Sequence, residues 1–291
     1  PQAAEMLCAP VGTASVAAVF SSVFYMRLAS GMLCATTADI DDGPISIRTS
    51  AQLDWRRVGL RKGQPVDLTR HHLRIVGLLA IDLSDAPVWQ PNSVSPTFNS
   101  QDVSSALHQL RAQLKDHDGV PGLGALMIPG FQPPQNDAVF RRAAPLIASA
   151  GDWITGVVRG NSQAPADWAV SLLGAGPGLT PSGDDVLGGA LLALRATGHA
   201  NVAEALWRQI APELTLRTNE ISATLLAAAA MGHGSAAVHE VISALTGGAP
   251  PALDGALAAI DRIGHSSGWD TLLGVVTVLD TLAITPLNRA A

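Results

Sequence analysis

The stretch Gly174-Ala-Gly-Pro-Gly-Leu-Thr-Pro-Ser-Gly-Asp-Asp185 separates two apolar runs and organises the second half of the chain. Its four glycines and two prolines in twelve residues favour one defined loop conformation. The apolar residues after it recur at helical spacing, so the loop is expected to lead into a helix. Thr180 could cap that helix with Pro181 as its first residue, or Ser182 could cap it with Asp185 in a capping-box-like pair.

The charge of this loop is opposite to that of a nucleotide-binding loop. Gly178 and Gly183 have the G-x-x-x-x-G spacing, but Asp184 and Asp185 stand where such a loop has Lys and Ser or Thr. Free N–H groups at a helix start favour an anion. The two carboxylates could instead hold Mg²⁺, exchange a proton or accept hydrogen bonds from an amide. Alternatively they only complement the helix dipole, which is worth about 0.3–1 kcal/mol each.

Composition restricts the class of protein. The 291 residues are 47% hydrophobic and only 14% charged, with a net charge of −6, as in a globular protein of one large or two ordinary domains. The negative charge argues against nucleic-acid binding, and the low charge content favours burial against partner chains. The basic stretch Arg56–Arg74 is the exception, and is either a contact face for an acidic partner or a solvated edge.

Neither a disulfide framework nor a membrane anchor is expected. Cys8 and Cys34 are the only cysteines, so a reducing cytoplasm is the expected location. The uncharged segment Met6–Met26 contains Pro10 and several small polar residues, which predicts a buried strand or turn and not a membrane span. No other run looks long and apolar enough to span a membrane.

The chain is predicted to be an α+β protein, with a β-rich N-terminal domain of residues 1–98 and a larger α-helical domain of residues 99–291 that carries the glycine-rich loop and the ligand site. Strand-like runs at 16–37 and 45–48 flank an acidic turn, and short runs continue over 66–83 before a linker at 87–96. The loop 119–135 could act as a lid. Helices are predicted at 103–117, 136–150, 165–173, 181–197, 201–211, 217–231, 235–246, 252–263 and 267–283.

A second segment, Gly264-His-Ser-Ser-Gly-Trp-Asp270, repeats part of the opening stretch. Both share the pattern Ser-Gly-x-Asp-x-Leu-x-Gly, which is Ser182 to Gly189 in the first copy and Ser267 to Gly274 in the second. We expect Gly189 and Gly274 to let two helix backbones approach closely, so that the two helix starts converge on one ligand. The alternative is two ordinary capping boxes.

The second segment also matches G-x-S-x-G, the pattern of a nucleophile elbow. An elbow needs a preceding strand, whereas the residues before Gly264 have helical periodicity, so a Ser266 nucleophile with His265 as base is disfavoured. His265 is better suited to donate a hydrogen bond, or act as general acid, to a bound oxyanion.

A third segment, Leu216–Ser222, also lies at a predicted helix start. The planar guanidinium of Arg217 suits a carboxylate or phosphate, unless it pairs with Glu213 or Glu220 on the surface. The eight histidines show no metal-binding spacing.

Together, Gly176–Asp185, Arg217-Thr218 with Ile221-Ser222, and Gly264–Asp270 resemble the AllH-type family, whose namesake is a subunit of oxamate carbamoyltransferase. The resemblance covers about residues 20 to 283. Ser22-Val-Phe24 and Gly43-Pro44 fit more loosely. The family pattern has a His before that Ser and an Asn after the Phe, whereas this chain has Ser21 and, nearby, Ala29 and Ser30. These departures count against a role for the N-terminal segment in ligand binding.

The resemblance implies carbamoyl transfer between oxalurate or oxamate and phosphate, in allantoin and purine breakdown, by a complex of three different subunits. The substrate would be a small anionic amide or carbamoyl phosphate. Asp184, Asp185 and His265 are the catalytic candidates. The residues expected to bind the anion are Gly176, Gly178, Thr180, Ser182, Gly183, Arg217, Thr218, Ser266, Ser267, Gly268 and Asp270. Two other functions stay open: a non-catalytic subunit that binds an anion or scaffolds a partner, and a stand-alone metal-dependent amidohydrolase.

Overall fold

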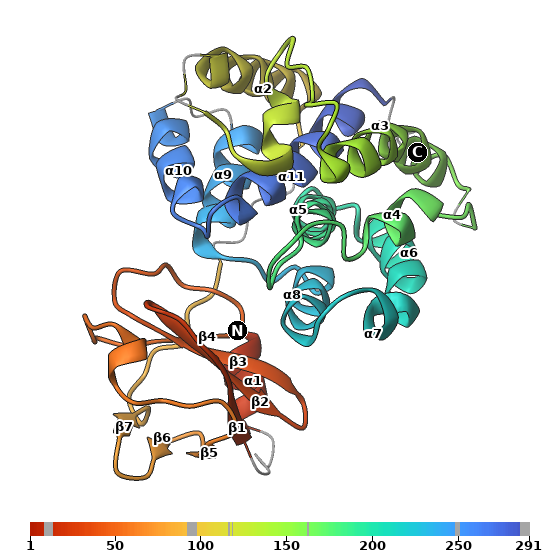
Figure 1. Cartoon of the computed structure of the whole chain (residues 1–291). Helices are drawn as coiled ribbons and strands as arrows, with labels where there is room; N and C mark the ends of the chain where they lie inside the picture. Colours follow the sequence, from red (N-terminus) through yellow and green to blue (C-terminus); the bar gives the residue numbers. More distant parts are fainter. Residues whose placement is uncertain are drawn as a thin grey trace. The chain divides into compact units, whose positions relative to one another are not determined.

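The computed structural model describes residues 1–8, 14–91, 98–115, 117, 119–161, 163–247 and 251–285. Contacts divide the chain into two units, one of Pro1–Pro91 with His233–Ala236 and one of Asn92–Gly232 with Ala237–Ala291. The first holds a sheet and the second is helical, which confirms the predicted α+β class (Figure 1). The predicted linker at 87–96 overlaps residues 92–97, which lie outside the described residues.

The first unit is built on a seven-stranded sheet of order β4-β3-β2-β1-β5-β6-β7. In β2, Phe24, Met26 and Leu28 are buried and alternate with more exposed residues, as expected of a strand with one face on a core. The strands are β1 (Ala14–Val19), β2 (Val23–Leu28), β3 (Gly31–Thr36), β4 (Ser46–Arg48), β5 (Pro65–Leu68), β6 (His72–Ile75) and β7 (Leu79–Asp82).

Two details of this unit differ from expectation. The chain begins with a short helix, α1 (Gln2–Cys8), where the sequence of Met6–Met26 predicted a strand or turn; β1 and β2 confirm the later part, and residues 9–13 lie outside the described residues. The strands on either side of the acidic turn are present, but β3 and β4 pair in parallel, with Cys34 opposite Ser46. The acidic segment is therefore a crossover and not a hairpin turn.

The six cations of the basic stretch 56–74 are all exposed. Arg56 lies in the 3-10 helix η1 (Trp55–Arg57) and donates to Asp54 at 2.6 Å, which lowers the pKa of that carboxyl group to about 2. Trp55, the first residue of η1, is buried against Phe24. The exposure of the six cations is compatible with both interpretations of the stretch, a solvated edge and a contact face.

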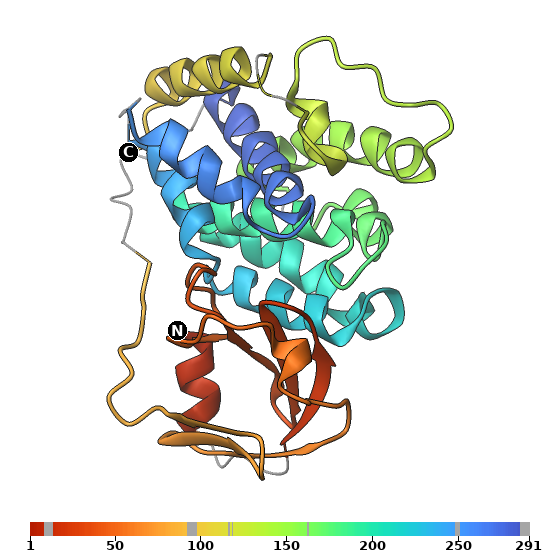
Figure 2. The ribbon, with the colours of Figure 1, turned by 60° about the vertical axis from the view of Figure 1, so that its left-hand side comes forward.

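The second unit is helical throughout its regular structure, as predicted (Figure 2). Its α-helices are α2 (Ser100–Lys115), α3 (Ala138–Val158), α4 (Asp167–Leu172), α5 (Ser182–Ala196), α6 (Ala200–Ile210), α7 (Leu214–Arg217), α8 (Glu220–Ala230), α9 (Ala236–Thr246), α10 (Pro251–Asp261) and α11 (Ser267–Ile284). The 3-10 helices are η2 (Gly122–Met127) and η3 (Ala211–Glu213). Helix α3 continues beyond its predicted end at residue 150, and the predicted helix at 217–231 is divided between the end of α7 and α8.

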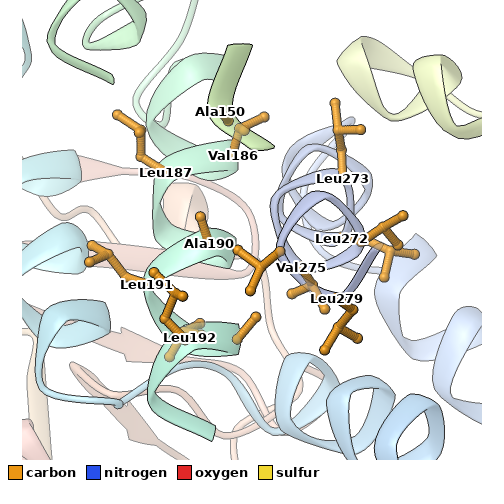
Figure 3. Close-up of a cluster of buried hydrophobic side chains, with 14 of the residues drawn as sticks. Ala150, Val186, Leu187, Ala190, Leu191, Leu192, Leu272, Leu273, Val275 and Leu279 are labelled. Atoms are coloured by element: carbon orange, nitrogen blue, oxygen red, sulfur yellow. The ribbon is translucent and has the colours of Figure 1, made fainter. Parts of the chain in front are cut away.

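Helix α11 is the core of this unit and packs against α5, η2, α2, α3 and α10. In Figure 3, buried Val275 of α11 points toward α5 beside Ala190, whereas Leu187 and Leu191 lie on the opposite side of α5. The buried apolar area of such side chains is the main favourable term in folding.

Among the described helices, α11 alone is long and apolar enough to cross a membrane by length and composition. The expectation that no other run would meet that criterion was therefore wrong. However, 67% of this helix is buried inside the helical unit, which is typical of the central helix of a core.

Candidate functional site

The two repeated segments form the crossing of α5 and α11. A Cβ at Gly189 would lie 2.9 Å from the Thr271 carbonyl carbon, and closer still to its oxygen. A Cβ at Gly274 would lie 2.9 Å from the Ala190 nitrogen, and closer still to the Val186 oxygen. The two helix backbones are thus in direct contact at these glycines, as predicted.

This crossing has an approximate internal twofold relation. Gly189 of the first copy contacts Thr271, and Gly274 of the second copy contacts Val186. Thr271 and Val186 occupy equivalent places in the two copies of the repeat. The glycines at the two helix starts are also equivalent. A side chain at Gly183 would clash with the Leu172 carbonyl of α4, and one at Gly268 with the Ile260 carbonyl of α10. Each copy is therefore a helix start held against the helix before it.

The hydroxyl groups at these helix starts do not act as caps. The N-cap positions are Pro181 for α5 and Ser266 for α11, and neither makes a side-chain capping bond. The Thr180 hydroxyl instead pairs with the Ser267 hydroxyl of the other copy at 2.8 Å. The prediction that Thr180 or Ser182 caps α5 was therefore wrong, and so was the alternative of two capping boxes. These hydroxyl groups bond to side chains of the other copy in preference to the backbone N–H groups of their own helix.

Each copy supplies a hydroxyl to the aspartate of the other. The Ser182 hydroxyl lies close enough to Asp270 to lower the pKa of that acid, and the hydroxyls of Ser267 and Thr180 act in the same way on Asp185. The two helix starts therefore converge, as the repeat predicted. This exchange places two carboxyl groups close enough for the charge of Asp270 to raise the pKa of Asp185.

Asp270 is fully buried and is surrounded by donors. The Gly124 N–H of η2 donates to its Oδ1 at 3.2 Å, and the Ser266 hydroxyl donates to its Oδ2 at 2.9 Å. A Cβ at Gly122, whose φ is +62°, would come within 2.9 Å of the same carboxylate. Burial raises the pKa of Asp270, and the bonds from Ser182, Ser266 and η2 oppose that rise. Part of the predicted lid loop 119–135 is thus a fixed 3-10 turn on this aspartate.

Asp185 has fewer partners than Asp270. Its Oδ2 is buried and accepts no hydrogen bond, although part of the residue reaches the surface. Burial raises the pKa of Asp185 well above its ordinary value, and the neighbouring charge of Asp270 raises it further. A buried acid in such surroundings favours the neutral form.

Asp184 joins the first segment to the third. Its Oδ1 accepts the Gly174 N–H at 2.8 Å, and its Oδ2 accepts the hydroxyls of Ser222, at 2.7 Å, and Thr218. Asp184 is almost completely buried, with 2% of the surface of the residue exposed. Asp184 therefore fixes the glycine-rich loop to the start of α8 and is positioned as a structural acceptor.

The conformation of the glycine-rich loop is set by close contacts of its backbone. Gly174, Gly176 and Gly178 have φ values of +68°, +121° and +99°, a region that favours glycine. Gly174 lies against the Arg217 carbonyl, and a Cβ at Gly176 would be 2.8 Å from the Ser182 nitrogen. The exposed tip at Leu179 is held by its carbonyl, which accepts the Asn219 amide at 2.9 Å. The loop conformation thus depends on backbone contacts that other residues could not make.

Two predicted residues lie away from the buried carboxyl groups. The Arg217 guanidinium pairs with Glu213 at 2.9 Å on the surface of α7, which is the alternative that its sequence context allowed. The His265 side chain is exposed in the turn before α11. The structure brings together most of the remaining candidates: Thr180, Ser182, Gly183, Asp184, Asp185, Thr218, Ser266, Ser267, Gly268 and Asp270.

The predicted Mg²⁺ ligands, Asp184 and Asp185, are not arranged as a metal centre. Within the described ranges, no group of three or more His, Cys, Asp or Glu side chains could hold a metal ion. Asp184 already accepts three hydrogen bonds from protein donors, which leaves few of its lone pairs for a magnesium ion, a cation that needs several oxygen ligands. The residues present therefore do not fit the cation.

Sequence reasoning missed Ser222, Gly124 and Asn219. Ser222 is the second donor of α8 to Asp184, and Gly124 supplies the N–H to Asp270. Asn219 caps α8 by accepting the N–H groups of Ile221 and Ser222. Asn219 had a local signal, since Asn is a preferred N-cap residue just before a helical run, and Ser222 belonged to the family-like pattern without being assigned a role.

Comparison with protein families gives two matches that together cover most of the chain. Residues 172–279 match the family model described as oxamate carbamoyltransferase subunit AllH. Residues 2–88 match the model of the AllH family N-terminal domain. The first match contains all three of the segments that meet at the α5–α11 crossing. No solved structure gave a significant match to the chain.

Proposed function

Because this chain belongs to the AllH family, we propose that it is a subunit of an oxamate carbamoyltransferase complex and that the α5–α11 crossing contributes to the active site. One observation carries the second part of this proposal. Three segments far apart in the sequence are joined by three buried or partly buried aspartates, Asp184, Asp185 and Asp270. Such a concentration of polar contacts inside an apolar helical unit is typical of a functional site.

In this proposal the complex transfers a carbamoyl group between a small amide acid and phosphate. Both ligands are anions, and the starts of α5 and α11 converge on the partly exposed Thr180–Ser267 pair. Helix N-termini and hydroxyl groups stabilise bound carboxylates and phosphates. Arg217 would have to leave Glu213 before it could contribute charge.

A non-catalytic role is the second candidate. Asp184 and Asp270 are buried and accept hydrogen bonds from several segments, so they could serve only to hold a surface for a catalytic partner subunit. A stand-alone metal-dependent amidohydrolase has no comparable support, because the donor set does not fit a metal ion.

The test is turnover of a complex reconstituted from this chain and its candidate partner subunits. Phosphate and oxalurate are supplied, and formation of carbamoyl phosphate is measured with and without this chain. We expect turnover only when the chain is present. Turnover that does not depend on the chain would refute its role as a subunit of this enzyme.

Two matched variants separate the catalytic role from the scaffolding role. Thr180→Val removes the hydroxyl that pairs with Ser267, whereas Thr224→Val removes one that bonds only to the Glu220 carbonyl of its own helix. If the crossing forms part of the active site, Thr180→Val lowers turnover per assembled complex and Thr224→Val does not. Equal turnover in both, with normal assembly, would favour the scaffolding role.

A further inference from the structure

The two carboxyl groups at the α5–α11 crossing have unequal partners despite their equivalent places in the repeat. Asp270 accepts the Gly124 N–H and the Ser266 hydroxyl. A backbone N–H can only donate, so it requires an acceptor oxygen on Asp270. Asp185 instead contacts the hydroxyls of Thr180 and Ser267, and a hydroxyl can either donate or accept.

The second oxygen of Asp185 strengthens this contrast. Oδ2 is buried without a hydrogen-bond partner. A charged carboxylate oxygen in that position would be severely penalised, because burying an ion without a partner is far less favourable than burying a neutral group. The same oxygen in a carboxylic acid carries much less charge.

We propose that Asp185 is held as a neutral carboxylic acid in the folded protein, and that the Thr180–Ser267 hydroxyl pair exchanges its proton with a small anion bound at the two helix starts. The proposal rests on the function proposed above for the same site. It assigns different states to the equivalent acids of the repeat: Asp185 holds the proton and Asp270 is the carboxylate.

The hydroxyl groups of Thr180 and Ser267 provide the path for the proton. Thr180 and Ser267 are both partly exposed, lie 2.8 Å apart and both contact Asp185. They therefore connect a buried acid to the surface through groups that can pass a proton. A neutral Asp185 also removes one negative charge from behind the anion, while the charges of Asp184 and Asp270 are offset by their donors.

The charged groups that face Asp185 also favour its protonated form. Asp270 comes from α11 and Asp184 from its own helix, and both raise the pKa of Asp185 in addition to burial. Helix η2, which packs on α11 at this point, has no titratable side chain.

The direct test is the infrared carbonyl stretch of a protonated carboxylic acid, recorded at neutral pH on the full chain. The difference between wild type and Asp185→Asn should contain this band, since asparagine is close in shape to the neutral acid. Asp184→Asn and Asp270→Asn are the matched controls. Each removes a charge that raises the pKa of Asp185, but burial, the largest cause, remains, so the band should stay in place. The proposal is overturned if wild type lacks the band, or if Asp270→Asn removes it while Asp185→Asn does not.

A second measurement follows stability against pH. The folded-state pKa of Asp185 lies above the unfolded value of 3.8, so the folded state binds more protons between the two values. The free energy of unfolding of wild type should therefore fall as pH rises through that window, relative to Asp185→Asn. The melting temperature of Asp185→Asn should exceed that of wild type increasingly toward high pH. A constant difference between the two proteins would contradict a neutral Asp185. Neither measurement needs turnover, so this proposal can fail separately from the proposed function.

Discussion

Asp184, Asp185 and Asp270 lie at two equivalent helix starts, but their surroundings give them different properties. Asp184 and Asp270 are buried acceptors with several donors each. Asp185 has an oxygen without a partner, and burial raises its pKa. Asp184 and Asp270 thus join several segments through their donors, whereas Asp185 leaves one buried oxygen unpaired. A buried acid with a raised pKa is typical of a functional site.

Replacing Asp184 should therefore destabilise the protein. In Asp184→Asn, the amide nitrogen can no longer accept from the Gly174 N–H or from the Thr218 and Ser222 hydroxyls, depending on which oxygen it replaces. We expect a loss of about 1–3 kcal/mol in the free energy of unfolding, measured by denaturant titration. Asp152→Asn, at an exposed position of α3, is the control and should stay within about 0.5 kcal/mol of wild type. Equal stability of both variants would show that Asp184 does not hold the loop.

The sequence was informative about which residues would matter and less so about their partners. Ser182, Ser267, Asp185 and Asp270 were identified from the repeated pattern, and the structure brings them together. Their exchange of hydrogen bonds between copies could not be predicted, because a Ser or Thr hydroxyl near a helix start bonds equally well to its own backbone. Only the crossing of the two helices decides between these partners.

At the scale of elements, the α5–α11 pair depends on two glycines whose Cβ positions are occupied by the backbone of the other helix. Apolar side chains of both helices belong to the buried core around this contact (Figure 3). Helical periodicity predicted both helices to within a residue or two at their ends, because buried positions at spacings of three and four are strongly patterned. Helix α1 and the parallel β3–β4 pairing were missed, since short elements carry few such positions.

Substitution of the neighbouring glycines Gly188 and Gly189 tests the backbone contact between α5 and α11. Gly189→Ala places a methyl group on the Thr271 carbonyl and must push the helices apart. Gly188→Ala meets only the Leu226 side chain, at 4.0 Å. We expect Gly189→Ala to lose about 1–3 kcal/mol or more of the free energy of unfolding, and Gly188→Ala to gain up to about 1 kcal/mol from its better helix propensity. Thermal or denaturant unfolding measures both. Similar stabilities for the two variants would mean that α5 and α11 are not in backbone contact.

At the scale of the whole molecule, the two family matches correspond to the two units of the structure. Residues 2–88 lie in the unit with the sheet, and most of residues 172–279 lie in the helical unit. The division into a β-rich and a helical part could be predicted from the change in hydrophobic pattern near residue 90. Membership of a complex could not, because composition indicates only that the chain has few charges for its surface. The family supplied that inference.

Turnover of the reconstituted complex containing Asp185→Asn tests the central claim most directly. The substitution keeps the size and neutrality of the side chain but removes the exchangeable acidic proton. We predict normal assembly and a fall in carbamoyl transfer of about 100-fold or more relative to wild type, which is the usual scale for loss of an acid–base group. The exposed Asp152→Asn serves as the control and should keep wild-type turnover. Wild-type turnover in Asp185→Asn would contradict a catalytic role for the α5–α11 crossing.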